Sequence, residues 1–299
     1  MDNLRISVVI PVFNGERYLG QAIESALGQS QSPHQVIVVD DGSTDSSRDI
    51  AKSFGDAIIF LPQINKGPGA ARNHGIEKSS GEWIAFLDAD DYWQSEKLAW
   101  QSAVVLDNPD VGLVYSGWTT LSDNGMSENI SAKPPEWVKK RLITQCPIVP
   151  STVLVRRSLM LQNSWSTKLG SSEDWWLFYR ISRNTKFASV EKPTTVYRIH
   201  NKSLTHRDWR SVLKYAQMVS AWIQNDFTGI ERISLKRVVD GRLLMNAAIA
   251  AREQGSHESF RLISRSLLAW PFPIGRSSRY KIFLKLLMQW LHDLVVPAS

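Results

Sequence analysis

Short runs of apolar residues recur along the first two hundred positions, each followed by a loop and a segment of helical periodicity. The first four runs lie at residues 6–10, 36–39, 58–61 and 83–87. They are too short for helices and too uniformly apolar for strands with one wet face, so we interpret them as buried strands. Their alternation with helices predicts an α/β fold: a mixed, mainly parallel sheet flanked by helices, with right-handed crossovers.

Acidic residues follow two of these strands. The second strand runs into Asp40 and the fourth into Asp88-Ala89-Asp90-Asp91. Carboxyl ends of parallel strands meet at one sheet edge, where ligands bind. Asp88 and Asp90 could there hold Mg²⁺ or Mn²⁺ together with substrate phosphates. A solvated acidic turn is the alternative, and Asp91 is interpreted as the N-terminal charge of a following helix.

The middle of the chain continues the pattern less regularly. Further strands are expected at residues 111–115, 151–155, 187–190 and 194–197, and residues 122–136 are expected to form a polar loop acting as a lid or acceptor region. A helix from Glu173 would carry Asp174 in its first turn, where acids commonly serve the helix dipole alone. The glycine-rich stretch 65–73 matches neither dinucleotide-binding nor P-loop spacing.

From Trp209 onward the pattern is helical only, which divides the chain into residues 1–205 and an all-α region at 206–299. Residues 207–299 hold 14 Lys and Arg against 7 Asp and Glu, whereas residues 1–206 hold 21 against 22. This bias suggests an anionic surface as partner, either a membrane or a nucleic acid, although solubility alone also explains it. The segment 280–296 has a wide apolar face that would either pack on the other helices or lie in a membrane interface. A homodimer contact is a further option, and no nucleic-acid partner is expected.

The composition limits the class of protein, the kinds of cysteine site and the location that we expect. The content of 43% hydrophobic and 21% charged residues is that of a globular protein, and Cys146 as the one cysteine excludes internal disulfides and multi-cysteine zinc sites. We expect no signal peptide before the first strand, and no run reaches the roughly 18 apolar residues of a spanning helix. The expected location is cytoplasmic, with peripheral attachment to the inner face of the plasma membrane as an option.

Five motifs follow one another along the chain: SVVIPVFN at 7–14, VDDGSTD at 39–45, NKG at 65–67 with ARN at 71–73, LDADD at 87–91, and Glu173-Asp174. In this order they resemble the inverting family 2 glycosyltransferases of the GT-A fold, of the type that builds bacterial cell-surface polysaccharides. Each motif is weak alone. Their order and spacing make the match specific over residues 6 to about 200, and only the tail lies outside it.

The resemblance implies a nucleotide-diphospho-sugar donor, usually a UDP-sugar, a Mn²⁺ or Mg²⁺ ion, and a hydroxyl acceptor on a glycan or lipid-linked molecule. For the nucleotide it assigns Pro11 and Phe13 to the base, Asp40 to the ring N–H of the base, Arg72 to the uracil, and Asp88 to the ribose or metal. It assigns Asp90 and His200 to the metal and Asp174 to general-base catalysis. The residues assigned to the acceptor are Glu173, Trp175 and Trp176. Arg198 belongs to a segment expected to close over the diphosphate.

Two other functions compete with this interpretation. An inactive nucleotide-sugar-binding scaffold would keep the fold without catalysis, but all the reactive carboxylates are retained. A sugar nucleotidyltransferase would prefer a nucleoside triphosphate, but the chain lacks a basic glycine-rich signature after its first strand. Inverting transfer needs one base and a metal that holds charge on the leaving phosphate, and the motifs supply residues for both.

Overall fold

The computed structural model describes residues 4–143, 145–168, 173–199, 209–226 and 229–271. The chain forms two compact units, Met1–Ser203 and Leu204–Ser299.

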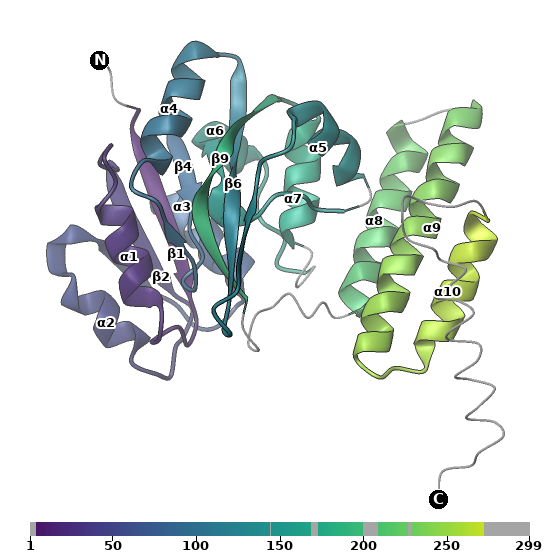
Figure 1. Ribbon diagram of the computed structural model, residues 1–299, viewed down its shortest axis with the longest axis horizontal. Helices are drawn as coiled ribbons and strands as arrows, with labels where there is room; N and C mark the ends of the chain where they lie inside the picture. Colours follow the sequence, from purple (N-terminus) through teal and green to yellow (C-terminus); the bar gives the residue numbers. More distant parts are fainter. Residues whose placement is uncertain (1–3, 144, 169–172, 200–208, 227–228, 272–299) are drawn as a thin grey trace, which may run out of the picture. The chain divides into compact units, whose positions relative to one another are not determined.

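The described strands of the first unit form one mixed sheet of nine strands (Figure 1). Its order is β3-β2-β1-β4-β8-β6-β9-β5, with β7 paired to β6. The strands are β1 (Ile6–Val12), β2 (Gln35–Asp40), β3 (Ile59–Pro62), β4 (Trp83–Phe86), β5 (Tyr92–Trp93), β6 (Val111–Ser122), β7 (Ser127–Ile130), β8 (Leu154–Arg156) and β9 (Lys186–Ile199). The first four are parallel to one another, which brings the ends of β1, β2 and β4 to one edge.

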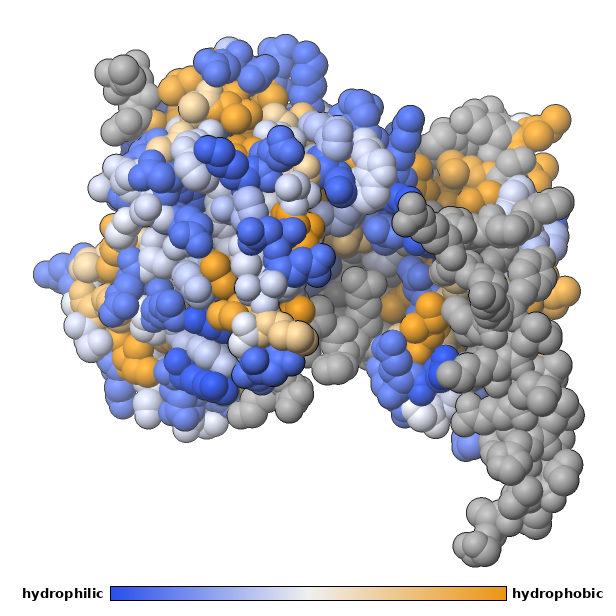
Figure 2. All heavy atoms as spheres, viewed as in Figure 1, coloured by the Kyte–Doolittle hydropathy of each residue, from blue (hydrophilic) through white to orange (hydrophobic). Residues whose placement is uncertain are grey.

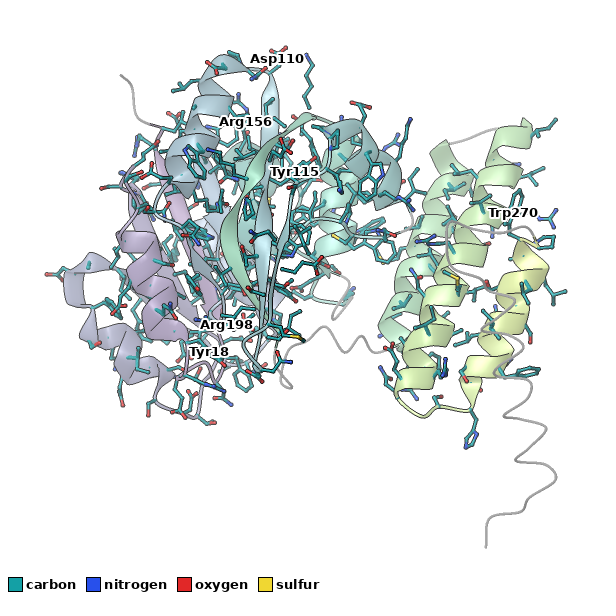
Figure 3. All side chains as sticks on the ribbon, viewed as in Figure 1. Tyr18, Asp110, Tyr115, Arg156, Arg198 and Trp270 are labelled. Atoms are coloured by element: carbon teal, nitrogen blue, oxygen red, sulfur yellow. The ribbon has the colours of Figure 1, made fainter. Side chains whose placement is uncertain are left out.

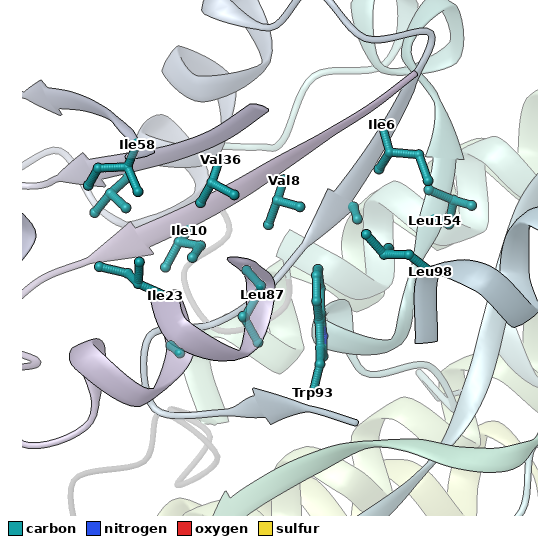
Figure 4. Close-up of a cluster of buried hydrophobic side chains, with 14 of the residues drawn as sticks. Ile6, Val8, Ile10, Ile23, Val36, Ile58, Leu87, Trp93, Leu98 and Leu154 are labelled. Atoms are coloured by element: carbon teal, nitrogen blue, oxygen red, sulfur yellow. The ribbon is translucent and has the colours of Figure 1, made fainter. Parts of the chain in front are cut away.

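Helices cover both faces of this sheet. They are α1 (Leu19–Leu27), α2 (Ser47–Ser53), α3 (Pro68–Lys78), α4 (Lys97–Asp107), α5 (Pro135–Leu142), α6 (Arg157–Gln162) and α7 (Glu173–Ser182), with short 3₁₀ turns at Gly55–Ala57 and Pro150–Thr152. Alternate residues of each strand face opposite layers. Val8 and Ile10 of β1 pack with α1 and α4 in the main core (Figure 4), whereas Val9 faces α3. A Cβ on Gly75 would lie 2.5 Å from Val9, so glycine lets α3 approach the sheet closely.

This architecture confirms the predicted α/β class, and it corrects several boundaries. The polar loop expected at 122–136 is a hairpin: β6 runs to Ser122, a turn at Asn124-Gly125 follows, and β7 pairs back before α5 begins. Gly125 has a φ of 79°, which is the conformation that makes Asn-Gly a hairpin signal. The two closing strands are one strand, β9, whose pairing with β6 passes Pro193 at a register shift.

The second unit is helical, with α8 (Trp209–Asp226), α9 (Gly229–Glu253) and α10 (Glu258–Ala269) among its described residues. Its core joins Val212 of α8 to a run of small residues on α9 and to Leu262 and Ile263 of α10. Small side chains such as Ala247, Ala248 and Ala251 allow the helices to pack closely. None of the described helices is both long and apolar enough to cross a membrane. The amphipathic segment expected at 280–296 lies outside the described residues.

Candidate active site

Two loops interlock where β1 and β2 end. The side-chain oxygen of Asn14 accepts the backbone N–H of Thr44 at 2.8 Å, and Ser43 Oγ accepts the N–H of Asn14 at 3.0 Å. Asn14 has a φ of 51°, a conformation that asparagine adopts more readily than most residues. The interlock leaves the ring of Phe13 51% exposed at the rim, while Pro11 is buried in β1. Only Phe13 of this predicted pair therefore offers a free face to a base.

Asp40 is fully buried and both its carboxylate oxygens have partners. Oδ1 accepts the N–H of Ser43 at 2.8 Å, and Oδ2 accepts Nε and Nη2 of Arg48 at 3.0 and 2.9 Å. A ring N–H of a base would have to share this carboxylate with Arg48. The sequence predicts no role for the next residue, Asp41. It accepts the N–H groups of Lys66 and Gly67, each at 2.8 Å, and so fixes the glycine-rich loop.

Arg72 joins two motifs that are far apart in the sequence. Its Nη2 donates to Asp88 at 2.6 Å, and its Nη1 donates to Glu173, 101 positions away, at 2.5 Å. The guanidinium also lies 4.4 Å from the ring centroid of Trp165. Gly69 makes room for this arrangement, because a Cβ there would collide with Oε2 of Glu173. Arg72 thus belongs to a buried ionic cluster that links the acidic run to the start of α7, and its contact with the uracil stays a prediction.

The cluster contains more acids than cations, because Arg72 is one cation among several carboxylates. Burial lowers the pKa of Arg72, but Asp88 and Glu173 outweigh it and hold that pKa above its ordinary value. Burial raises the pKa of Glu173 to about 7, with Arg72 pulling it down and Asp174 and Asp88 pushing it up. Arg72 is therefore a permanent cation, while Glu173 changes charge near neutrality.

The side chains of the acids at 88–91 differ in burial. The Asp88 side chain is 23% exposed, and its backbone N–H donates to Ser151 Oγ at 3.1 Å. Asp91 is fully buried and accepts Ser151 Oγ at 2.5 Å and the N–H of Arg198 at 3.0 Å. Its predicted role as the charge of a following helix is wrong, because β5 follows and the carboxylate points inward. Burial raises the pKa of Asp91, and Asp90 and Asp88 add to this.

Arg198 closes this part of the edge from β9. Its Nη1 donates to the backbone oxygen of Asp90 at 2.6 Å, and its guanidinium lies 4.5 Å from the ring centroid of Tyr18 and 4.8 Å from that of Tyr92. Figure 3 shows Arg198 and Tyr18 side by side at this end of the sheet. Arg198 therefore holds the Asp90 backbone in place from a distant strand. His200, predicted as a metal or phosphate contact, lies outside the described residues.

A divalent cation fits these acids only with help from a substrate. Within the part of the chain that the structure describes, no group of three or more His, Cys, Asp and Glu could hold a metal alone. Asp88 and Asp90 are both partly exposed at the end of β4. Two carboxylates completed by diphosphate oxygens are a usual setting for Mg²⁺. The donor set thus fits a metal that arrives with a nucleotide diphosphate.

The start of α7 separates the residues predicted for the acceptor side. Asp174 is partly exposed, whereas Glu173 is turned inward to Arg72. Trp175 is 2% exposed and its Nε1 donates to the backbone oxygen of Leu142 at 2.7 Å. The acceptor roles predicted for Glu173 and Trp175 do not fit this arrangement, because neither presents a surface. Trp176 is partly exposed and stacks on Tyr179, with ring centroids 6.2 Å apart.

Comparison with known proteins points to a family. Residues 7–144 match the model of glycosyl transferase family 2. This match supports a family 2 glycosyltransferase. This glycosyltransferase is 26% identical over 234 residues to the Escherichia coli UDP-Glc:alpha-D-GlcNAc-diphosphoundecaprenol beta-1,3-glucosyltransferase WfgD, covering 77% of this chain and 91% of the relative.

Two solved structures establish that the glycosyltransferase has the GT-A fold. One is S. aureus TarS 1–349 in complex with UDP-GlcNAc, with a TM-score of 0.70, 19% identity, and coverage of 89% of this chain and 81% of that one. The other is the mannosyltransferase PcManGT from Pyrobaculum calidifontis in complex with GDP-Man and Mn²⁺. Its TM-score is 0.58 at 17% identity, covering 100% of this chain and 89% of that one.

Proposed function

We propose that this glycosyltransferase moves a sugar from a nucleotide-diphospho-sugar, a UDP-sugar in the first place, to a hydroxyl of a glycan or lipid-linked acceptor in cell-surface polysaccharide synthesis, with inversion at the anomeric carbon. The observation that carries the proposal is the Arg72 bridge, which brings the Asp88 loop and the start of α7 together. The named E. coli relative and the nucleotide-sugar complexes of the two neighbours support the donor and acceptor classes.

The donor would lie along the edge formed by β1, β2 and β4. Phe13 would offer a ring face to the base, and Asp40 would accept the ring N–H of the base on a carboxylate that it shares with Arg48. Asp88 and Asp90 would hold Mn²⁺ or Mg²⁺ with the diphosphate. When bound, the metal neutralises negative charge on the leaving nucleoside diphosphate. Arg198, by fixing the Asp90 backbone, keeps this loop in position.

Asp174 would act as the general base. In an inverting displacement, the acceptor oxygen forms a bond to the anomeric carbon as the bond to the leaving phosphate oxygen breaks, and the hydroxyl proton passes to the base. Asp174 is partly exposed at the start of α7, next to a residue anchored on Arg72. Glu173 cannot take this role from its place, because its carboxylate faces the guanidinium.

A lipid-linked acceptor would place the enzyme at a membrane surface. We include in the proposal that residues 1–205 are the catalytic domain and that residues 206–299 attach it to the inner face of the plasma membrane. A homodimer through the same region stays a prediction.

Calorimetry with UDP-, GDP- and dTDP-sugars and with UTP, each with and without Mn²⁺, tests the donor. We expect a Mn²⁺-dependent preference for a nucleotide-sugar, weakened strongly in Asp90→Asn. Tighter binding of UTP than of any nucleotide-sugar would favour a nucleotidyltransferase instead. Once a donor and acceptor are known, NMR of the product tests inversion, and a product that keeps the donor's anomeric configuration would contradict it.

A further inference from the structure

We propose that one end of the helical unit is a docking surface for an anionic phospholipid bilayer. At this end α8 finishes and α9 begins, and α10 runs toward it and finishes beside Arg237 of α9 (Figure 1). We call six of its side chains the basic-apolar patch: Ile230, Arg232, Ile233 and Arg237 of α9 and Leu268 of α10, which are exposed, and Lys236 of α9, which is partly exposed. The proposal rests on the membrane attachment proposed above for residues 206–299, and it does not depend on the donor or on the catalytic residues.

Direct contacts bring these residues of the patch together. Arg237 Nε donates to the backbone oxygen of Ala269 at 3.0 Å, which joins the first part of α9 to the last turn of α10 beside Leu268. A shallow cavity of about 330 Å³ is lined by Gln224, Arg232, Ile233, Lys236 and Arg237. The cavity therefore combines three cationic side chains with an isoleucine.

The apolar members are unusually exposed. Ile230, Ile233 and Leu268 are 83%, 56% and 79% exposed. Among the described residues of this unit they are the exposed large hydrophobic side chains, and all three lie at this end. Figure 2 shows hydrophobic, orange atoms at the upper end of the unit, over the start of α9. Ile230 and Ile233 are neighbours on one face of α9 through their i,i+3 spacing, and such exposed apolar neighbours favour an interaction surface.

The charge of the patch indicates which partner it binds. The cations of the patch are Arg232, Lys236 and Arg237, and Lys236 forms an ion pair with Asp240 at 2.5 Å. The chain beyond α10, residues 272–299, contains four Lys and Arg and one Asp, so its charge has the same sign as the patch. A second copy docked through the same patch would also bring like charges together. An anionic bilayer accepts both features, since cations bind its headgroups and isoleucines enter the interface.

Vesicle flotation of the full-length protein tests the proposal. Phosphatidylcholine vesicles are compared with vesicles that also contain phosphatidylglycerol. We expect binding to the anionic vesicles only, decreasing as salt is added. Arg232→Gln with Lys236→Gln should lower the partition coefficient by ten-fold or more, because each cation near such a surface contributes roughly five-fold. Ile230→Ser with Ile233→Ser should also lower it.

Matched controls separate the patch from general charge and stability. Arg252→Gln with Arg261→Gln removes two exposed cations near the opposite end of α9 and α10, and Ile64→Ser removes a 74% exposed isoleucine from the first unit. Both should float like the wild type, as should Asp174→Asn, so failure of the proposed catalysis would leave this result readable. Circular dichroism checks that each variant folds.

Three results would overturn the proposal. The first is equal flotation of the patch variants and the wild type, and the second is an equal loss in the control variants. The third is a change of oligomeric state in the patch variants, measured by analytical ultracentrifugation, without a change in vesicle binding. That last outcome would assign the patch to a second copy of the chain.

Discussion

Replacing Arg72 should cost far more stability than replacing its partner Glu173. Arg72→Met keeps an unbranched side chain over Trp165 but removes the cation between Asp88 and Glu173. The Arg72 side chain is 7% exposed and that of Glu173 is 8% exposed, so water cannot replace the lost charge. Removing one partner of a buried ionic group costs about 3–5 kcal/mol. Because Asp88 is 23% exposed and partly solvated, we expect the lower end of that range.

At pH 4.5, where the native carboxyl is protonated, Glu173→Gln should cost only about 1 kcal/mol, the typical net value of one hydrogen bond. The pKa of Glu173 is about 7, raised mainly by burial, so near neutral pH the native side chain is protonated about half the time. Glutamine has the shape of the protonated acid, and its oxygen can still accept from Arg72 Nη1. Arg72 also keeps Asp88 as a counter-ion.

Denaturant unfolding followed by tryptophan fluorescence measures both variants, because Trp165 lies directly against the guanidinium. The double variant Arg72→Met/Glu173→Gln should lose less than the sum of the single losses, since the glutamine removes a carboxylate that the methionine left without its cation. A loss in Glu173→Gln equal to or larger than that in Arg72→Met would refute the view that one cation serves several acids.

Three further predictions concern the same edge. The free energy of unfolding of the wild type, relative to that of Glu173→Gln, should fall by roughly 3 kcal/mol between pH 4.5 and pH 7. The reason is that a carboxyl whose pKa is raised on folding stabilises the fold while it is protonated. A difference between the two proteins that stays the same in urea titrations at both pH values would contradict this. Gly69→Ala should destabilise by about 1–3 kcal/mol by displacing Glu173, and a Tm equal to wild type would contradict it. Ser151→Ala should cost about 1–3 kcal/mol and weaken Mn²⁺ binding measured by calorimetry, because the buried Asp91 loses a donor; unchanged values would remove this role.

Local patterns in the sequence predicted the parallel half of the sheet, because the runs at 6–10, 36–39 and 83–87 are buried on both faces and read as continuous apolar stretches. The acids at their ends were predicted to meet for the same reason. The hairpin at Asn124-Gly125 had a readable turn signal, but the polar residues around it hid the strands.

The other features of the site depend on contacts between residues far apart in the sequence, and such contacts leave no local pattern. The bridge from Arg72 to Glu173 spans 101 positions, and nothing near either residue announces the other. Asp91 resembles its neighbours in sequence, and only the arrival of Ser151 and β9 turns it inward. Trp175 differs from Trp176 by one position on a helix, which is enough to move it from the surface to the core.

The most direct test of the central claim is sugar transfer by Asp174→Asn, measured together with its affinity for the donor. We predict that turnover falls by about 10²–10⁴-fold, the usual contribution of a positioned base, while the Kd for the nucleotide-sugar with Mn²⁺ stays within a few-fold of wild type. Turnover close to wild type would contradict the assignment of Asp174 as the base at the edge that Arg72 assembles.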